Sequence, residues 1–577
     1  MSEWWTYRPE DFLLFSPRVY WRMFELHNAA LWPLHVLTLG AGLIIILLIA
    51  RRSGIGARWI AFILAMLWIF VGWSFLWNRY ATINWAVAME AAIRVLSWTW
   101  LFHMFAASAE WSEAGFRSRF LRALYLHGDW IERNLERSDV SGNHYTADAA
   151  GLVFAGLFFG AGRAPERWAA LGWDILTTEI ERQVQADGVD FEGSTAYHRL
   201  VMEFFLLPAL YREQLGLSTP ARYRERLVAM ARFVAAYSRD DDGCPSWGDG
   251  DDGRALPLGS QPLADHRYLI GLVAAGWDVD EVRDRFSGPR DEIFWLLGPD
   301  AAARLPSTLN AVSATPAAFP ASGVYILRSK RDHVFVDAGP VGMRGRGGHG
   351  HNDCLSFDAV LDGSHLFADP GTYVYTASYE WRNRFRGTAF HNTPVVDGEE
   401  QNRLDPGLLW ALANDARPTV ERWQSSPELV QIRASHSGYE RLGRPVIPVR
   451  TIALDPRAHR LAVFDELRGD GVHELVVPYH MAAGVLVERS GPGRFTIRAR
   501  GRAFVIAWDP PSEWSSRTIP GWVSPSYGRR ERASVIEFVR AGELRPLLVV
   551  CVPEAAADRG LEWARSALGL TPSLRPA

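Results

Sequence analysis

The sequence predicts an α+β multidomain protein in which N-terminal transmembrane helices are followed by a helical domain and an antiparallel β-sandwich. Three observations indicate this order. Two uncharged apolar segments precede residue 80, helix-length segments with a helical apolar period extend to about residue 300, and short apolar or alternating runs follow residue 320. Because 577 residues are too many for one core, we expect several domains. Their predicted ranges are 1–84 (membrane anchor), 85–306 (helical domain), 307–320 (linker) and 321–577 (sandwich).

The composition is that of a folded protein without a nucleic-acid partner. Hydrophobic residues make up 48% of the chain and charged residues only 22%, which excludes disorder on the scale of a domain. The net charge of −4 provides no field that would attract nucleic acid. Cys244, Cys354 and Cys551 are far apart and odd in number, so they imply no disulfide framework and leave the redox compartment open.

Residues 34–50 and 59–77 are the predicted transmembrane helices. Each segment is uncharged and close to the ~20 residues that a helix needs to cross a bilayer. Trp32 precedes the first segment, and Trp59 and Trp77 bracket the second, as in the aromatic belt of membrane proteins. A pair of helices buried in a soluble core is the alternative.

The charges around these segments favour an uncleaved anchor. About thirty residues, several of them acidic, precede the first apolar run, and the run ends in Ile-Ala-Arg-Arg instead of a small-residue cleavage site. Arg51, Arg52 and Arg58 lie between the two segments, which favours a cytoplasmic loop. We therefore expect a protein anchored in a bacterial cell envelope with its soluble domains outside the cytoplasm. A third apolar stretch, 83–107, contains Glu90 and Arg94 one helical turn apart, which favours an amphipathic helix of the soluble part.

The helical domain is predicted from repeated apolar-periodic segments punctuated by Gly, Pro and Asp. They read as helical hairpins packed in series. The segments are 116–135, 147–159, 167–184, 196–215 and 221–238.

The sandwich follows a stretch rich in Ala, Ser, Thr and Pro. Beyond it, short apolar or alternating runs are bounded by Gly, Pro and Asp, as is typical of an antiparallel β-sandwich. The runs are 323–328, 333–337, 461–465, 474–479, 494–497 and 547–552.

His349 and His351 stand one residue apart in Gly-Gly-His-Gly-His-Asn-Asp, Asp369 follows in Ala-Asp-Pro-Gly, and His391 lies in Phe-His-Asn-Thr. On a strand, the first two imidazoles would point to the same face. A carboxylate and a third imidazole from neighbouring strands could then complete a metal site with His and Asp ligands. The alternative is that the histidines only satisfy hydrogen bonds. A histidine left unligated would be free for proton chemistry.

The helical half carries two further candidate clusters at helix entrances. Asn143 and His144 precede an apolar helix, and Glu192, Tyr197 and His198 lie in Asp-Gly-Val-Asp-Phe-Glu-Gly-Ser-Thr-Ala-Tyr-His. Each cluster also has a purely structural interpretation, as a helix cap with packed neighbours.

Two other polar segments have less specific patterns. The segment 245–254 looks superficially like a calcium loop but lacks the bidentate Glu of an EF-hand, so we expect a structured loop near a cleft. Arg382 and Arg386 could bind carboxylate or sulfate, or belong to a solvated face.

Together these motifs resemble the heparinase II/III-like polysaccharide lyases, which include related alginate and oligoalginate lyases. The resemblance extends from about Trp85 to the C-terminus and implies an incomplete (α/α) toroid followed by an antiparallel β-sandwich. It rests on Gly-Asn-His (142–144), Asp-Gly-x-x-x-Glu-x-Ser-x-x-Tyr-His (187–198), Gly-Asp-x-Asp-Asp-Gly (248–253), Gly-His-Gly-His-Asn-Asp (348–353), Asp-Pro-Gly-Thr-Tyr (369–373) and Thr-x-x-His-Asn-Thr (388–393).

The resemblance implies β-elimination at a uronic acid of an acidic polysaccharide. The C5 proton leaves and the 4-O-glycosidic bond breaks, which requires a neutralised carboxylate, a base and an acid. By resemblance, Asn143 and His144 contact the carboxylate, with His144 assisting or acting as a base. Tyr197 is the general acid, and on some substrates also the base, for which its pKa of ~10 requires nearby cations. His349 is a second neutraliser or base. The further expected substrate contacts are Glu192, His198, Arg382 and Arg386.

The resemblance also implies a structural zinc ion, since His351, Asp369 and His391 match the zinc ligands of the family. The glycine between His349 and His351 would allow close backbone approach while each ring keeps its own task. One departure is Ala147, where some members carry an acidic residue. The first 85 residues have no counterpart in the secreted lyases and faintly resemble small bacterial multi-helix membrane proteins, so a fusion is the simplest account.

Two other functions are compatible with parts of the pattern. A cupin-like oxygenase could use the His and Asp set to bind non-haem iron, but it gives Asn143, His144 and Tyr197 no role. A membrane-tethered glycan-binding or assembly protein could hold a polymer without cleaving it. The polymer itself stays open: heparin or heparan sulfate requires basic residues along the cleft, whereas alginate, hyaluronan-like chains and bacterial exopolysaccharides do not.

Overall fold

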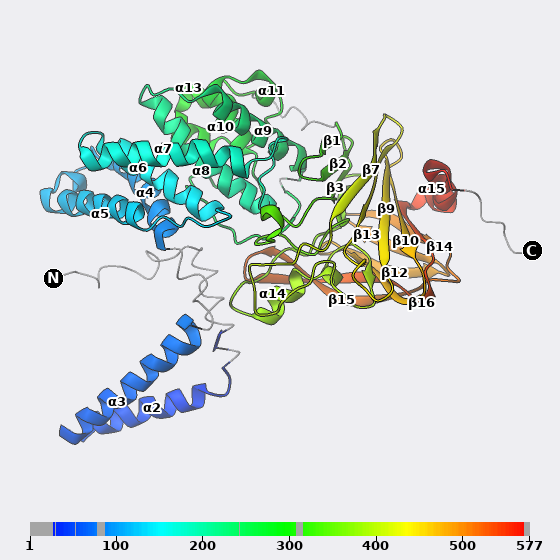
Figure 1. Ribbon diagram of the computed structural model, residues 1–577, viewed down its shortest axis with the longest axis horizontal. Helices are drawn as coiled ribbons and strands as arrows, with labels where there is room; N and C mark the ends of the chain where they lie inside the picture. Colours follow the sequence, from blue (N-terminus) through cyan, green and yellow to red (C-terminus); the bar gives the residue numbers. More distant parts are fainter. Residues whose placement is uncertain are drawn as a thin grey trace, which may run out of the picture.

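The computed structural model describes residues 27–28, 31–51, 54–77, 87–241, 243–306 and 315–570. Figure 1 shows three parts: a pair of apolar helices, a helical domain, and a β-sheet domain that ends in a C-terminal helix. The predicted anchor is described only in part, since residues 1–26 and 78–84 lie outside the described ranges. Most of the predicted linker, residues 307–314, also lies outside them.

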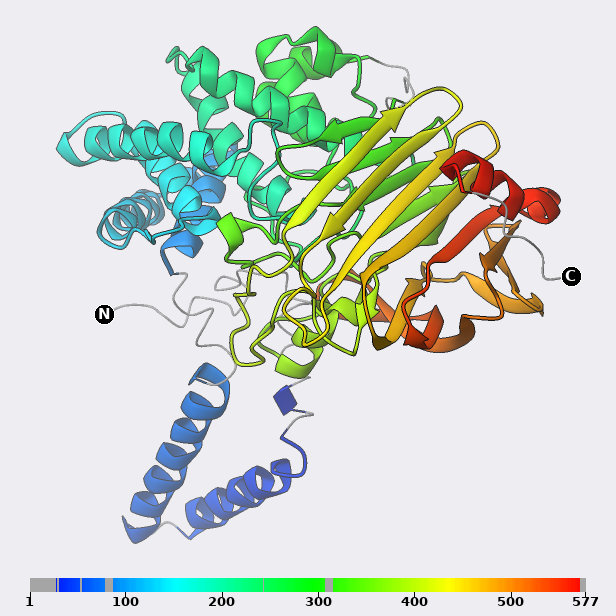
Figure 2. The ribbon, with the colours of Figure 1, turned by 45° about the vertical axis from the view of Figure 1, so that its right-hand side comes forward.

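Two apolar helices form a hairpin that projects away from the other two parts (Figures 1 and 2). They are α2 (His35–Ala50) and α3 (Gly54–Val71), and a π-helical segment (Gly72–Trp77) continues α3. No residue of α2 is buried, and Trp68 of α3 is 73% exposed. The described part of the chain therefore does not bury these two helices in a soluble core. Residues 55–74 are long and apolar enough to cross a membrane by length and composition, and α2 is a shorter apolar helix.

The helical domain contains the five predicted helices within a few residues of their expected ends, together with α4, which was predicted as an amphipathic helix. In α4, Ala91, Ala92 and Val95 are buried, and Glu90 pairs with Arg94 at 3.2 Å. The helices are α4 (Val87–Phe105), α5 (Ala114–Arg133), α6 (Asn143–Phe159), α7 (Arg163–Gln183), α8 (Thr195–Gln214), α9 (Ala221–Tyr237), α10 (Tyr268–Trp277), α11 (Asp280–Arg283), α12 (Asp291–Leu297) and α13 (Pro299–Ala303).

Helices α6 and α8 form the centre of this domain, and their first turns carry the predicted site residues. Both are buried over most of their length. In α6, Ala and Gly let neighbouring helices approach closely. A Cβ on Gly151 would lie 2.6 Å from the Cβ of Ala92 in α4. Ser194 caps α8 by accepting a hydrogen bond from the Tyr197 N–H at 3.1 Å, which fixes the turn that presents this tyrosine.

The C-terminal domain is the predicted antiparallel β-sandwich, and all six predicted runs lie in strands. Its three sheets have the strand orders β1-β2-β3-β4-β5, β12-β13-β14-β17-β10-β9-β8-β7 and β15-β16-β11-β6. A core of aliphatic and aromatic side chains joins the sheets, with Phe357, Tyr479 and Phe538 among its members. Figure 2 shows the eight-stranded sheet facing the viewer.

The strands of the first sheet are β1 (Ala317–Phe319), β2 (Val324–Arg328), β3 (His333–Asp337), β4 (Phe357–Leu361) and β5 (Ser364–Phe367). The second sheet contains β7 (Pro418–Ser425), β8 (Val430–His436), β9 (Val446–Asp455), β10 (Arg460–Gly469), β12 (Leu486–Gly491), β13 (Arg494–Ala499), β14 (Arg502–Asp509) and β17 (Leu547–Pro553). The third contains β6 (Val395–Val396), β11 (Val472–His480), β15 (Ser515–Ser526) and β16 (Arg529–Glu543), and two helices complete the domain, α14 (Tyr379–Phe385) and α15 (Gly560–Leu568).

The segment that holds His349 and His351 is a loop between β3 and β4, so the expectation that both lie on a strand is wrong. Gly350, between the two histidines, lies close to the backbone of Val341. A Cβ at position 350 would lie 2.1 Å from the Val341 carbonyl oxygen. The predicted close backbone approach is confirmed. In a loop the two imidazoles need not share one face, and they contact different groups.

Backbone hydrogen bonds join the helical domain to the sandwich where the site lies. The Asp249 N–H donates to the His349 carbonyl at 2.9 Å, and the Met343 N–H donates to the Phe191 carbonyl at 2.6 Å. The Gly250 N–H donates to Thr372 Oγ1 at 2.7 Å. The loop 245–254, expected near a cleft, therefore forms part of the joint between the domains.

Candidate active site

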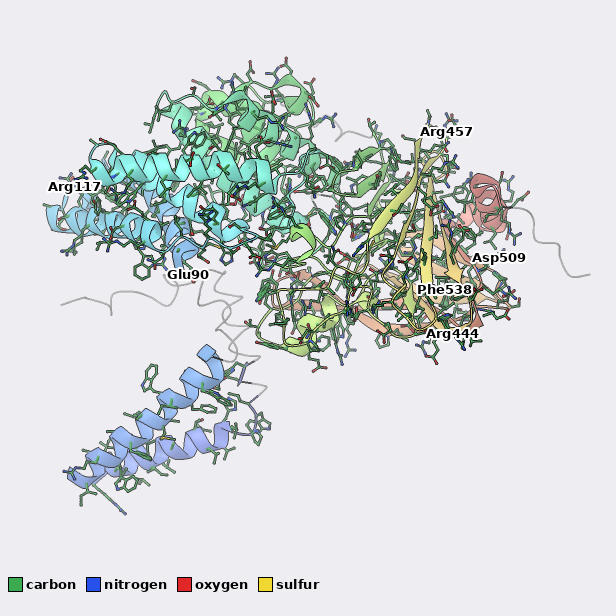
Figure 3. All side chains as sticks on the ribbon, viewed as in Figure 1. Glu90, Arg117, Arg444, Arg457, Asp509 and Phe538 are labelled. Atoms are coloured by element: carbon green, nitrogen blue, oxygen red, sulfur yellow. The ribbon has the colours of Figure 1, made fainter. Side chains whose placement is uncertain are left out.

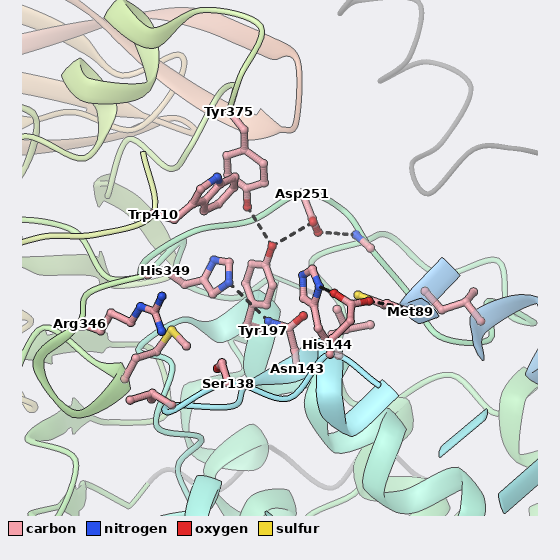
Figure 4. Close-up of a pocket in the computed structure, with 18 of the residues that line it drawn as sticks. Met89, Ser138, Asn143, His144, Tyr197, Asp251, Arg346, His349, Tyr375 and Trp410 are labelled. Carbon is pink, nitrogen blue, oxygen red and sulfur yellow. Dashed lines mark hydrogen bonds and ion pairs between the residues drawn. The ribbon is translucent and has the colours of Figure 1, made fainter. Parts of the chain in front are cut away.

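A cavity of 320 Å³ opens between the helical domain and the sandwich (Figure 4). The first turns of α6 and α8 form its lower side, and loops of the sandwich form the opposite side. The lining residues with polar or aromatic groups at its centre are Asn143, His144, Tyr197, His349, Tyr375 and Trp410. The structure thus brings together the four predicted catalytic residues, which come from three segments up to about 200 residues apart.

Tyr197 is buried at the centre of this cavity. Its hydroxyl donates to Asp251 Oδ2 at 3.0 Å and lies 3.3 Å from the Tyr375 hydroxyl, and its ring stacks on the His349 ring with a centroid distance of 3.7 Å. Burial and the carboxylates of Asp251 and Asp249 raise the pKa of Tyr197 well above its usual value. Tyr197 is therefore a neutral phenol, a state suited to donating a proton and unsuited to accepting one.

His349 is oriented by hydrogen bonds on both ring nitrogens. Its Nδ1 lies 3.1 Å from Asp249 Oδ2, and its Nε2 lies 3.4 Å from Asn143 Nδ2 and 3.6 Å from Glu192 Oε2. A carboxylate at Nδ1 holds the ring hydrogen there, which leaves a lone pair on Nε2. The Nε2 atom faces the cavity, so it can accept a proton beside the Tyr197 phenol.

Asn143 begins α6 and is held by Glu192. The Asn143 backbone N–H donates to Glu192 Oε1 at 2.6 Å, and its Nδ2 donates to Glu192 Oε2 at 2.8 Å. A glycine precedes it because a Cβ at position 142 would lie 2.4 Å from Glu192 Oε1. Glu192 itself is fully buried and does not line the cavity. The substrate contact of Glu192 stays a prediction; in the structure its carboxylate orients the Asn143 amide.

His144 presents a partly exposed ring to the cavity and pairs with Glu136. Its Nδ1 lies 2.7 Å from Glu136 Oε2, and 44% of its side chain is exposed. Desolvation favours the neutral ring, but the hydrogen bond and charge of Glu136 outweigh it and raise the pKa of His144. His144 is therefore the histidine of the cavity that is best suited to carry a positive charge.

Asp148 lies beneath Glu136 instead of in the cavity. It accepts from the Glu136 N–H at 2.7 Å, and burial raises the pKa of Asp148 to about 8. Ala147, where some family members carry an acid, is fully buried. Neither residue replaces the missing acidic group in the cavity.

The other three expected substrate contacts also have buried side chains, which make hydrogen bonds within the fold. His198 accepts from the Asp190 N–H at 3.2 Å, and burial lowers the pKa of His198 to about 3. Arg386 donates to backbone carbonyls, including that of Leu408 at 2.9 Å. Arg382 is fully buried and donates to Asp249 Oδ2 at 2.7 Å. Arg386 donates from all three guanidinium nitrogens, and the one Arg382 nitrogen without a partner in the described ranges, Nε, is buried, so neither arginine presents a donor to the cavity.

Asp249 connects the catalytic and metal-ligand candidates and was given no role from the sequence. One oxygen faces His349 Nδ1 at 3.1 Å, the other lies 2.9 Å from His351 Nε2, and Arg382 donates to both. Desolvation opposes the ionised form, but Arg382 and the two histidines hold the pKa of Asp249 far below its usual value. The motif Gly-Asp-x-Asp-Asp-Gly, which contains Asp249 and Asp251, was the signal that could have found both residues.

The three expected metal ligands meet in a buried cluster behind His349. One nitrogen or oxygen each of His351, Asp369 and His391 lie within 4.8 Å of one another. The His351 Nδ1 and His391 Nε2 atoms are buried and have no hydrogen-bond partner within the described ranges. Two unpaired imidazole nitrogens and a carboxylate are a donor set that suits a divalent ion such as zinc, and Asp249 holds the far nitrogen of His351 as an outer-shell carboxylate does.

The fold, a helical domain followed by a β-sandwich, is shared with solved structures. The chain superimposes on the crystal structure of heparinase III with a TM-score of 0.66 at 15% identity, covering 82% of this chain and 70% of that one. It superimposes on a heparan sulfate lyase from Pedobacter heparinus with a TM-score of 0.59 at 20% identity, covering 81% and 68%. These likenesses confirm the predicted toroid and β-sandwich.

Sequence comparison identifies the protein family of the chain. The model of the heparinase II/III N-terminus matches residues 77–258, and that of the heparinase II/III-like C-terminal domain matches residues 311–564. The chain therefore belongs to the heparinase II/III-like family, as the motifs predict.

Two curated relatives carry the name heparin-sulfate lyase. The relative from Bacteroides stercoris is 22% identical over 484 residues, which are 82% of this chain and 65% of the relative. The relative from Pedobacter heparinus is 25% identical over 356 residues, which are 58% of this chain and 49% of the relative. The chain thus spans half to two thirds of the length of these relatives.

Proposed function

We propose that this protein is a polysaccharide lyase that cleaves a uronic-acid-containing glycan by β-elimination. The observation that carries the proposal is the stacked pair of a neutral Tyr197 phenol and the His349 imidazole, with the Asn143 amide beside them in the interdomain cavity. The relatives named heparin-sulfate lyase act on a polymer of this chemical class, which supports the assignment.

The proposed reaction has three parts. The Asn143 Nδ2 hydrogen that faces His349 Nε2 in the free protein turns to the uronate carboxylate, which frees the Nε2 lone pair. The His144 cation binds the same carboxylate, and both contacts lower the energy of the negative charge that develops as C5 loses its proton. His349 Nε2 takes the C5 proton, and the electron pair of that C–H bond forms the C4–C5 double bond. The C4–O bond breaks, and its oxygen receives the proton of the Tyr197 hydroxyl. The products are a shortened chain and an unsaturated uronate, without consumption of water.

We assign the roles that the sequence left open on the basis of these contacts. His349 is the base because Asp249 holds the hydrogen on Nδ1 and Glu192 Oε2, 3.6 Å from Nε2, stabilises the imidazolium that forms. Tyr197 is the acid because carboxylates surround its hydroxyl, whereas a base role requires nearby cations. His144 is the neutraliser because Glu136 raises its pKa.

Replacing Glu136 by Gln is expected to move the alkaline limb of the kcat/KM profile to lower pH. A raised pKa keeps His144 protonated to higher pH, so the cation is lost as the pH rises through that value. Removing the Glu136 charge removes the cause of the raised pKa, and the loss then begins at lower pH. The control is Glu132→Gln. Glu132 lies on α5, and its carboxylate pairs with Arg167 of α7. An alkaline limb that does not move contradicts the role of His144.

We also propose that His351, Asp369 and His391 hold a structural zinc ion. Their buried, unpaired ring nitrogens support this, and none of the three lines the catalytic cavity. When bound, the ion would join the loops 349–351, 369 and 391 to one another. Through Asp249 this would fix His349, so the ion supports the geometry of the cavity without contacting substrate.

Removal of the metal by a chelator is expected to lower the free energy of unfolding by about 3 kcal/mol. This figure applies when the free concentration of the ion is about a hundred times its Kd. Calorimetry of the metal-loaded and chelated protein measures the shift in Tm, and elemental analysis measures the bound ion. His391→Ala should purify without stoichiometric metal, whereas His459→Ala, which removes a histidine paired with Asp332 elsewhere, should retain it. Wild-type protein that purifies metal-free and gains no stability from zinc would refute the site.

The helical hairpin is proposed to anchor the protein in a bacterial cell envelope, with the catalytic domains outside the cytoplasm. The exposed apolar surfaces of α2 and α3 support this, since such patches are rare on proteins that contact only water. The full chain should stay with the membrane pellet after an alkaline wash and be released by detergent. Replacing Leu64 in α3 by Arg should weaken this retention, because a charge at the bilayer centre costs about 3 kcal/mol. Recovery of the wild-type chain in the soluble fraction contradicts the anchor.

The two other functions fit the structure less well. An iron-dependent oxygenase needs open coordination positions that substrate can reach, whereas His351 and His391 are buried outside the cavity lining. A glycan-binding protein without activity accounts for the cavity but not for the stacking of Tyr197 on His349.

A panel of uronic-acid polymers, comprising heparan sulfate, non-sulfated heparosan, alginate and hyaluronan, tests the proposal by the ultraviolet absorbance of the unsaturated product. We expect absorbance to grow with at least one polymer and not with His349→Ala. Binding without any product would favour the glycan-binding function.

A further inference from the structure

The outer face of helix α5 carries a row of exposed residues that the described part of the chain leaves uncovered. The row consists of Arg119, Arg122, Leu126, Trp130 and Arg133. Because these residues are spaced three or four positions apart, they lie on one face of the helix, while the opposite face packs into the helical domain. Two of them are large and apolar, since Leu126 is 52% exposed and Trp130 is 49% exposed.

This face has an excess of positive charge. Arg119 and Arg122, together with Arg117 at the outer end of the helical domain (Figure 3), form no side-chain hydrogen bond or ion pair within the described ranges. The two acids within α5 already pair with arginines, one on α5 itself and one on α7. Glu113, whose charge acts on Arg119, is the N-cap of the helix. Unpaired arginines and exposed apolar side chains therefore share one surface.

Such a surface suits the headgroup region of a phospholipid bilayer. Tryptophan and leucine enter this region with their apolar parts, and the long arginine side chains place their guanidinium groups at the level of the phosphates. A soluble polyanion would use the arginines but would give Leu126 no apolar contact. The combination therefore favours a lipid surface over an acidic glycan.

The proposed anchor would keep α5 close to a membrane. The second apolar helix and its continuation end at Trp77, and α4 begins at Val87, so the chain between them spans at most about 35 Å. Helix α5 packs on α4, where the rings of Trp98 and Phe120 have a centroid distance of 5.7 Å. Figures 1 and 2 place α4 and α5 on the side of the helical domain toward the hairpin.

We propose that the outer face of α5 docks on the anionic phospholipid headgroups of the membrane that holds the anchor. This inference rests on the proposed anchor. Leu126 and Trp130 would enter the headgroup region, and Arg119 and Arg122 would bind phosphates. Residues of α4 and the segment after α5 line part of the catalytic cavity, so docking would hold this cavity near the membrane surface.

Photo-cross-linking of the full chain in phospholipid vesicles tests this surface. A benzophenone amino acid replaces Leu126 or, in separate variants, Trp68 of α3 and Leu486 of the sandwich, both of which are exposed. Mass spectrometry identifies lipid adducts in vesicles that contain phosphatidylglycerol and in vesicles of phosphatidylcholine alone. With phosphatidylglycerol we expect adducts at positions 68 and 126 and only background at position 486. With phosphatidylcholine alone, the yield at position 126 should fall about threefold or more, and the yield at position 68 should not change.

A charge variant isolates the part of the arginines. Arg119→Gln combined with Arg122→Gln should lower the yield at position 126 about threefold or more in the anionic vesicles. The matched control, Arg444→Gln combined with Arg457→Gln, removes two exposed arginines of the sandwich and should leave the yield unchanged (Figure 3). An unchanged Tm checks that each variant is folded.

The outcomes separate the docking surface from the anchor. Adducts at position 68 without adducts at position 126 overturn the docking surface and leave the anchor intact. Adducts at position 126 alone support docking and refute the anchor, and adducts at neither position refute both. Adducts at position 126 to a second copy of the chain, or a yield there that depends on neither the lipid charge nor the two arginines, overturn the proposal.

Discussion

Replacing Tyr197 by Phe is expected to lower kcat for glycan cleavage by about 10²–10⁴-fold while binding is retained, because the variant removes the proposed general acid and little else. The hydroxyl is the only polar atom of this side chain, and it faces Asp251 and the Tyr375 hydroxyl in the cavity. The Phe ring can keep the stack on His349. Without the hydroxyl proton, the departing C4 oxygen must leave as an alkoxide or take a proton from water.

The comparison that isolates this effect is Tyr125→Phe, which removes an exposed hydroxyl on α5. Initial rates measured by product absorbance, together with calorimetric affinity for the same oligosaccharide, separate chemistry from binding. A Tyr197→Phe variant that cleaves within tenfold of wild type would remove Tyr197 from the mechanism. Lost binding with unchanged kcat would make it a contact residue instead.

Replacing Asp249 by Asn is expected to affect both stability and activity. The substitution leaves the fully buried Arg382 guanidinium without its counter-charge, which costs about 3–5 kcal/mol of the free energy of unfolding. It also releases the hydrogen that Asp249 holds on His349 Nδ1, so the proposed base loses its tautomer and kcat should fall by about 10²-fold or more.

A double variant separates these two effects. Asp249→Asn combined with Arg382→Gln removes both buried charges, so part of the lost stability should return, whereas activity should not. Chemical denaturation measures the first quantity and product absorbance the second. Recovery of activity together with stability would mean that Asp249 acts only through the fold, and not by orienting His349.

Much of the architecture could be predicted because local patterns determine it. The apolar period of 196–215 and the alternation of 474–479 are properties of the segments themselves, and they became α8 and β11. The polar stripe of Glu90 and Arg94 correctly separated α4 from the two apolar helices before it. The segment around His349 is different. It is a loop in the structure, although its length does not distinguish it from a short strand in the sequence.

The site could be predicted only to the level of which residues meet. Motifs placed Asn143, Tyr197 and His349 together, but sequence alone does not show which polar side chains are neutralised inside the fold. The sequence does not show, for example, that the Glu192 carboxylate accepts a hydrogen bond from the Asn143 amide. Asp249 was unassigned because its partners lie about 100 residues or more away, and such pairings depend on how the two domains join.

The central claim is that cleavage is an elimination catalysed by Tyr197 and His349. Mass spectrometry of the products from a defined uronate oligosaccharide tests it most directly. We expect two fragments whose masses sum to that of the substrate, one carrying an unsaturated uronate, and both formed at least about a hundredfold more slowly by Tyr197→Phe. Fragments whose summed mass exceeds that of the substrate by one water molecule would show hydrolysis and contradict the account.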